Sequence, residues 1–594
     1  MFPLSVFIRV HPWLVIFCLL YAFASRRKFY AMKNTGAILI AAAILSLLGL
    51  FFFWPLALTV KSAFVFNGQW TLAIFSELVQ NPLYIEGLLN SLALAIVTTL
   101  LVVCMALPLA MLAARFDFWG KSWLTGLILL PMILPPFVGA IGIRQILGPY
   151  GVINAGLVNL HLIDWPQAVD WLGRGRFWAV AVTEALHLYP IFYLNAVAAI
   201  ANVDPTLEEA AENMGCAGWQ RFRRITLPLI MPGLFAGGTL VFIWSFTELG
   251  TPLMFDYPRV TAVQIYNGIQ DIGASPLPYA LVVVMLVASA GFYAFGKGVF
   301  GRASYAMLAK GSTAGSTQPL SGARAGAAFG LFAIVFLLAI LPHIGVILTS
   351  FSQAWYRSVA PSQWTLEWYR QALGHGLTLP SIRNSCFYAL LAMGADLILG
   401  VAAAVVIVRS SLRWRGALDT LIMLPLAVPG IVLAFGYITM SQPGRLFEGL
   451  NPTDNPTFLL IIAYAVRRLP YVVRAAVAGL QQISASLEEA AENLGCPPVQ
   501  TVARITLPLI SANLMAGGLL AFSFAMLEVS DSLMLAQKQA YFPITKALYE
   551  LFQVLGNGPY LAAALGVWSM LFLGITLLLT NRLLGQRLGA IFRL

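Results

Sequence analysis

The length, composition and charge of the chain are those of a polytopic membrane protein. Hydrophobic residues make up 60% of its 594 residues and charged residues 10%, whereas a soluble chain of this size carries roughly a quarter charged residues. The formal net charge of +11 does not require a nucleic-acid partner, because the basic residues are spread over short loops between apolar runs. Soluble enzymes and nucleic-acid-binding proteins are therefore excluded.

The N-terminal segment, residues 1–36, is apolar over residues 6–24 and then runs into three basic residues, Arg26 to Lys28. No small-residue cleavage site follows, so we expect no cleaved signal peptide. The segment either crosses the membrane as one extra helix, which we favour, or lies along the interface.

Twelve apolar runs long enough to cross a bilayer follow this segment. They fall at about 37–60, 88–113, 123–147, 177–201, 228–250 and 278–300, then at 327–350, 385–408, 417–440, 457–479, 508–532 and 561–584. We expect two tandem six-helix halves, residues 37–300 and 327–594, joined by a flexible linker at 301–326. Arginine and lysine concentrate in loops on one side, which the positive-inside rule makes cytoplasmic, and the C-terminus lies there too.

A polar segment interrupts this apolar pattern twice. Residues 206–228 follow the fourth run, and residues 486–508 follow the tenth. Both contain Leu-Glu-Glu-Ala-Ala-Glu-Asn, then a glycine, and both end in Ile-Thr-Leu-Pro. Equivalent residues are 280 apart throughout, as from Glu208 to Glu488, whereas a fainter repeat in the spans has an offset of 294, as from Asn90 to Asn384. A repeat on this scale indicates a duplicated unit.

The two copies predict the same local structure. Thr206 and Ser486 each stand three residues before a glutamate, a capping-box pattern that would start a helix. The alanine pairs favour helix and leave a smooth face that another protein can approach closely. Gly215 and Gly495 suit a left-handed helix stop. We therefore expect a short helix, a break, and a second piece leading into the next span.

This arrangement resembles the EAA loop of permease subunits in binding-protein-dependent ABC importers: Glu-Ala-Ala, three residues, Gly, nine residues, Ile-x-Leu-Pro. Both copies match at every position. The resemblance implies a fused type I permease in a bacterial inner membrane, whose two halves form a pseudo-dimer with both EAA loops cytoplasmic. It implies that the loops contact the ATPase through Glu209, Ala210, Ala211, Gly215, Glu489, Ala490, Ala491 and Gly495. Alternatively the glutamates are solvated, with Glu208, Glu212, Glu488 and Glu492 equally exposed.

The chain carries no Walker A pattern, no catalytic pair and no metal-ligand spacing. We therefore expect no enzyme activity and no cofactor in this chain. The resemblance implies two copies of a separate ATPase subunit, which would bind ATP and Mg, and an extracytoplasmic solute-binding protein. Membrane lipid is the remaining expected partner.

Ionisable residues inside spans are costly and mark functional candidates. Glu248 and Glu528 are equivalent by the 280 offset, and Glu184 and His187 align with Tyr464 and Arg467. The candidate pathway residues are Glu184, His187, Glu248, Arg467, Arg468 and Glu528. The alternative is that these charges form structural ion pairs.

The solute follows from resemblance alone. One chain with two EAA loops is similar to the iron(III)- and thiamine-type branch of these permeases, which implies iron(III) or an iron chelate. Thiamine, phosphonate, sugar phosphate and polyamine remain alternatives, because Arg467 and Arg468 suit an anionic or chelated solute and the glutamates suit a cation. An ion-coupled secondary transporter, using Glu248, Glu528 and Asp396 as ion sites, is the rival class. It leaves the twin polar segments unexplained.

Overall fold

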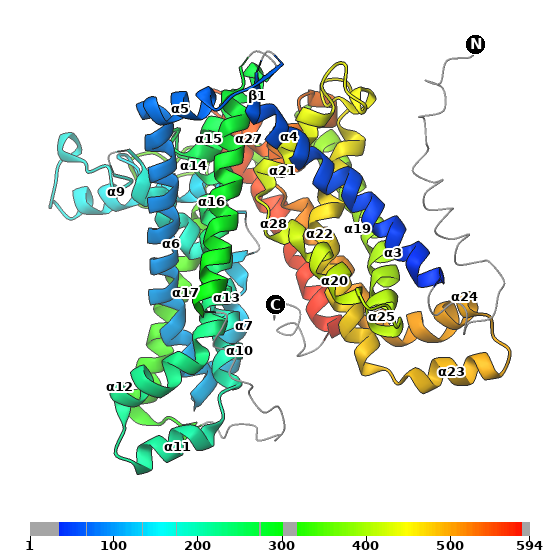
Figure 1. Cartoon of the computed structure of the whole chain (residues 1–594). Helices are drawn as coiled ribbons and strands as arrows, with labels where there is room; N and C mark the ends of the chain where they lie inside the picture. Colours follow the sequence, from blue (N-terminus) through cyan, green and yellow to red (C-terminus); the bar gives the residue numbers. More distant parts are fainter. Residues whose placement is uncertain are drawn as a thin grey trace.

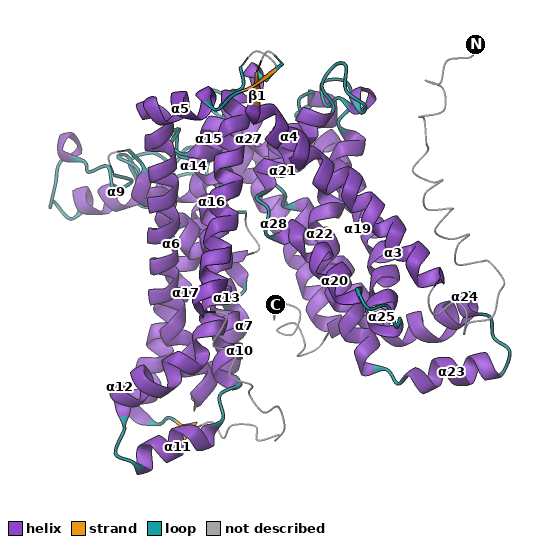
Figure 2. Ribbon diagram, in the orientation of Figure 1, coloured by secondary structure: helices purple, strands orange, loops and turns teal. Residues whose placement is uncertain are grey.

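A computed structural model describes residues 35–66, 68–132, 135–173, 175–272, 275–300 and 318–584. Residues 6–24, where an extra helix is expected, lie outside these ranges, as do most of the linker 301–326 and residues 585–594. Most of the described chain is helical (Figure 2), and the expected all-α fold is confirmed. The strands are two-residue pairings: β1 (Val65–Phe66) with β2 (Gln69–Trp70), and β3 (Phe116–Asp117) with β4 (Gln318–Pro319).

The long helices form two bundles that stand side by side and diverge toward one end (Figure 1). In the first bundle α6 (Pro82–Arg115), α10 (Phe177–Ala201) and α13 (Leu227–Phe246) pack against one another, and α16 (Leu277–Phe300) packs against α13. In the second bundle α19 (Thr378–Arg409), α22 (Thr457–Gln482) and α25 (Leu507–Met526) do the same, and α28 (Gly558–Leu584) packs against α25. The two halves that share the sequence repeat therefore also share the same arrangement of packed helices.

The first helix of each half also packs against helices of the other half. The continuous helix α3 (Thr35–Leu48), η2 (Gly49–Phe53) and α4 (Trp54–Phe64) packs against α19 and against α21 (Gly430–Met440). In exchange, α17 (Gly322–Phe351) packs against α8 (Pro136–Leu147) and α6.

Glycines allow the two exchanged helices to approach closely. A Cβ at Gly142 of α8 would overlap the backbone of α17 at Pro342, and a Cβ at Gly436 of α21 would lie 3.0 Å from the Cβ of Pro55 in α4. Gly142 and Gly436 are equivalent by the 294 offset. Both crossings therefore depend on the same missing side chain.

The third and ninth expected spans are bent rather than straight, which corrects the prediction for residues 123–147 and 417–440. In the first half, α7 (Lys121–Leu127) and η3 (Leu130–Met132) meet the segment Pro136–Asn159, which begins with α8, at 97°. In the second half, α20 (Arg415–Met423) and η7 (Leu424–Leu426) meet α21 at 94°. Prolines cause the break, since Pro135 and Pro429 directly precede α8 and α21 and disfavour helical geometry in the residue before them.

Nine described helices are long and apolar enough to cross a membrane, or eleven if each bent pair is one span. The remaining one of the twelve, the tenth expected span, is α22, which carries Arg467, Arg468 and Arg474. Most of its side chains are buried against neighbouring helices, and Arg467 and Arg468 are at most 19% exposed, so these two charges face protein and not lipid.

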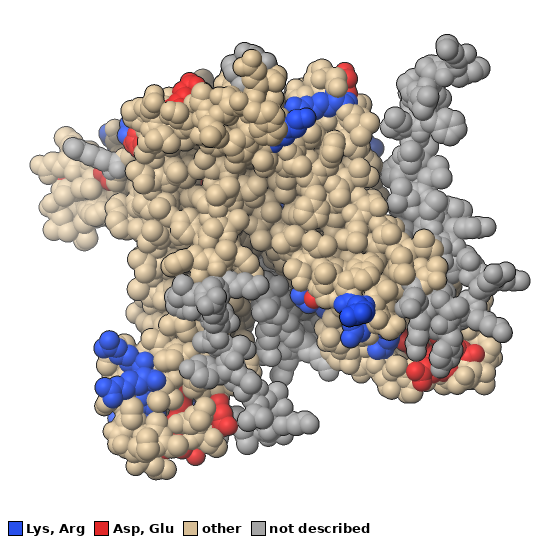
Figure 3. Space-filling view, in the orientation of Figure 1, with Lys and Arg blue, Asp and Glu red and all other residues tan. Residues whose placement is uncertain are grey.

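Charged side chains gather at the two ends of the molecule, and the band between them is almost free of charge on the face in Figure 3. Long helices expose apolar side chains to their surroundings, including Leu100 of α6, Leu337 of α17 and Leu390 of α19. An uncharged band of exposed apolar side chains is the surface that a bilayer covers.

Candidate functional site

The two polar segments form matching elements at the same end of the two bundles (Figure 1). The first consists of α11 (Pro205–Asn213), α12 (Gly218–Arg221) and the π turn η5 (Phe222–Thr226), which continues into α13. The second consists of α23 (Ala485–Asn493), α24 (Pro498–Thr501) and the π turn η9 (Val502–Thr506), which continues into α25. We call residues 205–226 the first arm and residues 485–506 the second arm.

The arm helices begin earlier than the capping-box pattern predicts. The N-cap of α11 is Asp204, whose carboxylate accepts hydrogen bonds from the backbone N and the hydroxyl of Thr206, at 2.9 and 2.8 Å. These bonds lower the pKa of Asp204. In α23 the cap is Ser484, which accepts from the backbone N of Ser486 at 3.3 Å. The expectation that Thr206 and Ser486 cap these helices is therefore wrong, because an acceptor two residues upstream already satisfies the first free N–H.

The glycine stops lie where the sequence predicts them. Gly215 and Gly495 have φ of +80° and +86°. The backbone N of Gly215 donates to Glu212 O at 2.9 Å, and the N of Cys216 donates to Ala211 O at 2.9 Å. The second arm repeats this pair of bonds, which is the Schellman arrangement of a helix C-terminus.

If the arms contact ATPase subunits, as the resemblance implies, replacing both glycines by valine is expected to uncouple ATP hydrolysis from uptake. No atom lies within 4 Å of an added Cβ at either position, so the effect is purely conformational, about 1–2 kcal/mol at each arm. Replacement by asparagine, which tolerates left-handed geometry, is the matched control and should retain most uptake. Uptake and ATPase rates of the reconstituted transporter measure both, and full coupling in the valine variant would contradict the role of the turn.

Each arm is tied to the first long helix of its own bundle by a buried charge contact. Glu208 of α11 pairs with Arg115 at the end of α6 and accepts a bond from the Thr226 hydroxyl at 2.6 Å. In the second half Glu488 pairs with Arg409 at the end of α19, 2.9 Å from its Nε, and accepts from Thr506 at 3.0 Å. These four charged side chains are at most 21% exposed. We call the two sets, Arg115–Glu208–Thr226 and Arg409–Glu488–Thr506, the arm latches.

The opposite face of each arm helix is exposed and apolar. Met214 and Leu494 are 86% and 89% exposed, and Leu207 and Leu487, seven residues before them, are about half exposed. Glu209, Ala210, Glu489 and Ala490 are exposed as well, so the expected coupling residues lie on a free surface. Ala211 is an exception, because it is buried, and Ala491 is half-buried. The exposed leucines and methionine were not predicted, although their seven-residue spacing indicates one helix face.

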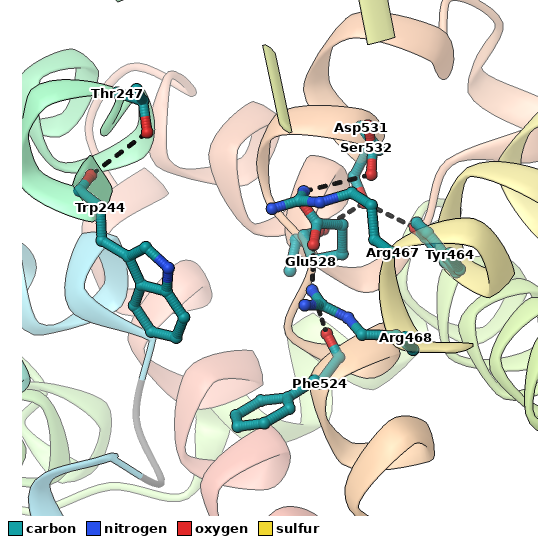
Figure 4. Close-up of polar contacts among 10 residues, drawn as sticks. Trp244, Thr247, Tyr464, Arg467, Arg468, Phe524, Glu528, Asp531 and Ser532 are labelled. Carbon is teal, nitrogen blue, oxygen red and sulfur yellow. Dashed lines mark hydrogen bonds and ion pairs between the residues drawn. The ribbon is translucent and has the colours of Figure 1, made fainter. Parts of the chain in front are cut away.

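The second set of expected site residues forms an ionic cluster between the middle of α22 and the turn that follows α25 (Figure 4). Arg467 Nη1 lies 2.5 Å from Glu528 and 3.3 Å from Asp531 in α26 (Ser530–Leu535). Arg468 pairs with the other oxygen of Glu528 and donates to Phe524 O at 3.2 Å. The hydroxyls of Tyr464 and Ser532 share a bond of 2.7 Å beside them. We call Arg467, Arg468, Glu528 and Asp531 the charge cluster; Glu528 pairs with both arginines in it.

The equivalent residues of the first half make no such cluster. Glu248 accepts from the backbone N and hydroxyl of Thr251, at 3.1 and 3.2 Å, and Glu184 accepts from the Ser245 hydroxyl. His187 Nδ1 lies 3.2 Å from Pro131 O. Within the described part of the chain, neither glutamate has an ion pair.

The turns that carry Glu248 and Glu528 meet between the two halves. The expected fifth and eleventh spans end at residues 250 and 532, but α13 and α25 end at Phe246 and Met526, so both glutamates lie in non-helical turns. A Cβ at Gly250 would lie 2.9 Å from the Val529 side chain. Glu248 and Glu528 are also close enough to interact electrostatically. The structure therefore brings these two predicted residues together. Glu184 is close enough to Glu248 to interact with it electrostatically, and His187 lines a small pocket with Pro342 and His343 of α17.

Two equivalent bundles with exchanged helices and paired arms define a membrane permease built by duplication. Residues 106–302 and 396–588 each match the family described as the binding-protein-dependent transport system inner membrane component. The chain therefore belongs to this family: it is a multi-pass inner-membrane protein and the permease component of an ABC importer, which works with ATPase and binding-protein partners.

Three relatives illustrate the range of the family. A putative ferric transport system permease protein, FbpB 1 of Haemophilus influenzae, is 29% identical over 83% of this chain and 77% of its own length. The ferric transport system permease protein FbpB of Actinobacillus pleuropneumoniae is 28% identical over 76% of this chain and 64% of its own length. A probable molybdenum ABC transporter permease protein of Haloferax volcanii is 33% identical over 36% of this chain and 75% of its own length.

Proposed function

We propose that this chain is the translocation pathway of an ATP-driven importer for iron(III) or an iron chelate, delivered by an extracytoplasmic binding protein. The observation that carries the class of function is the pair of arms, each with one face latched to its bundle and the other face exposed. The ferric permeases, which are similar over most of the chain, support the solute.

Each arm offers a separate ATPase subunit a helix to hold. Leu207 and Ala210 of α11 are exposed together with Met214, which directly follows the helix. Leu487, Ala490 and Leu494 repeat this arrangement at α23. A short helix with an apolar face fits a groove on a partner. Two such helices support two copies of the ATPase, with both arms and the C-terminus on the cytoplasmic side.

The cycle we propose is alternating access. ATP binding by the two subunits draws the arms together, and the latches carry this motion to α6 and α19. The binding protein docks at the far end, and the turns at Glu248 and Glu528 separate to admit the solute.

The electrostatics of the candidate pathway favour a cation. The charge cluster contains two basic and two acidic residues, so Arg467 and Arg468 offer no uncompensated charge to a free anion. Glu184 and Glu248 have hydroxyl and backbone partners instead. This balance supports iron(III) over phosphonate or sugar phosphate, although thiamine and polyamine, which are also cationic, fit the same balance.

Reconstitution tests the proposal directly. The permease is placed in vesicles with its ATPase, and uptake of radioactive iron is measured with loaded binding protein and ATP; we expect uptake that requires all three. Competition by thiamine or spermidine at equal binding-protein load identifies the alternative solutes. Uptake by the chain alone under an imposed ion gradient would instead establish a secondary transporter.

A further inference from the structure

The two arms differ sharply on the flank that faces the uncharged band. The first arm carries Trp219, Arg221, Arg223 and Arg224, and the second arm carries Val499, Thr501, Ala503 and Arg504 at the equivalent positions. Figure 3 shows the basic side chains of the first arm gathered over α12, at the edge of the uncharged band. The two arms are otherwise built alike, so this difference needs its own explanation.

The free charge on this flank comes from two arginines. Arg221 pairs with Glu212 at 2.6 Å, so its charge is compensated within the arm. Arg223 and Arg224 are exposed, and within the described residues neither has an ion pair. Beside them Trp219 is 72% exposed and lies against Phe222, with ring centroids 5.2 Å apart.

We propose that Trp219, Arg223 and Arg224 form a binding surface for the headgroup of an anionic phospholipid in the leaflet on the arm side. Arginines beside a membrane surface attract acidic lipids, and an exposed tryptophan is favoured at headgroup depth. The position of the basic side chains at the border of the uncharged band places them at that depth.

The internal repeat argues against the ATPase as the partner of these arginines. If two copies of one ATPase hold the two arms, as the proposed function states, the features they need occur on both arms. The exposed apolar faces, the glycine stops and the latches all do. The tryptophan and the second free arginine occur on the first arm alone, and the exposed flank of the second arm has Val499 and Ala503.

Such a contact would anchor one arm and leave the other free. The first arm would stay in place at the membrane surface, because it is bound to the lipid headgroups. When the two arms approach each other, most of the displacement would therefore occur in the second arm. The duplicated permease would then work asymmetrically even with identical ATPase subunits.

The test measures contact between the intact importer complex and lipid, without solute or ATP. The complex is placed in nanodiscs that contain phosphatidylcholine and a variable share of brominated phosphatidylglycerol, which quenches tryptophan fluorescence on contact. The difference between the wild type and Trp219→Phe isolates the signal of Trp219, and brominated phosphatidylcholine is the neutral-lipid control. We expect phosphatidylglycerol to quench Trp219 at a lower lipid share than phosphatidylcholine does.

Arg223→Gln with Arg224→Gln should weaken this preference by roughly fivefold for each arginine at low salt. Arg504→Gln, at the position equivalent to Arg224, should leave it unchanged. The surface is refuted by equal quenching with both lipids in the wild type, or by an unchanged preference in the double variant. A double variant that keeps the preference but no longer retains the ATPase would assign the arginines to the ATPase. Because no solute is involved, a wrong solute in the proposed function would leave these results untouched.

Discussion

Replacing Glu208 and Glu488 together by glutamine is expected to lower solute uptake at least tenfold while the ATPase subunits stay bound. Each change removes the charge that holds an arginine and a threonine across the latch, about 1.5–3 kcal/mol for each charge-assisted bond. The side chains are largely buried, so solvent does not replace the lost contact. The arms would still be gripped on their exposed faces, but they would no longer carry the motion to α6 and α19.

The control variants distinguish three effects: loss of force transmission through the latches, loss of ATPase binding to the arms, and loss of folding. Glu209→Gln with Glu489→Gln changes exposed neighbours on the same helices, and we expect it to reduce ATPase retention with no effect on the thermal stability of the permease alone. Exchanging the latch charges, Arg115→Glu with Glu208→Arg and the same in the second half, should restore part of the uptake. If the glutamine variants transport at the wild-type rate in vesicles, the latches do not transmit force.

The sequence predicts what is encoded locally or repeated. The arm helices and their stops follow from a motif and from glycines at positive φ, and the two halves follow from the 280-residue repeat. The equivalence of Asn90 and Asn384 also has a structural basis, since both side chains donate to a loop backbone, at Arg259 O and Ala540 O.

The latches could not be predicted because they depend on distant contacts. Arg115 and Glu208 are 93 residues apart, and each belongs to a loop rich in charge, where either reads as a solvated side chain. The motif instead drew attention to Glu209, the next residue, which faces outward. Only the packing of α11 against η5 and the end of α6 decides which glutamate is buried.

The exchange of first helices between the two halves could not be predicted from the sequence either. Nothing in the apolar sequence of α17 says whether it packs on its own half or on the other half. The sequence feature that indicates the exchange is the equivalent pair Gly142 and Gly436. At each of these glycines a helix from the opposite half approaches within van der Waals distance. The exchange ties the two bundles together.

The second large effect is expected at the charge cluster. Glu528→Ala should destabilise the permease by about 3–5 kcal/mol, because it removes the carboxylate that pairs with both Arg467 and Arg468 and leaves two largely buried guanidinium groups without it. Glu248→Ala, at the equivalent position of the first half, removes two bonds to a neutral partner and should cost about 1–3 kcal/mol. Thermal unfolding in detergent, followed by size-exclusion chromatography, compares the two.

The first half folds without a charge cluster, so its residues suggest a second substitution that should restore stability to Glu528→Ala. Leu188 and His187 occupy the positions of Arg468 and Arg467 there, and Leu188 is buried. Glu528→Ala combined with Arg468→Leu removes both partners of one ion pair, which is close to neutral when the space is filled by an apolar side chain. The combined variant should therefore be more stable than Glu528→Ala alone. If the second substitution adds to the loss, Glu528 does not act through Arg468, and the cluster owes its stability to Arg467 and Asp531.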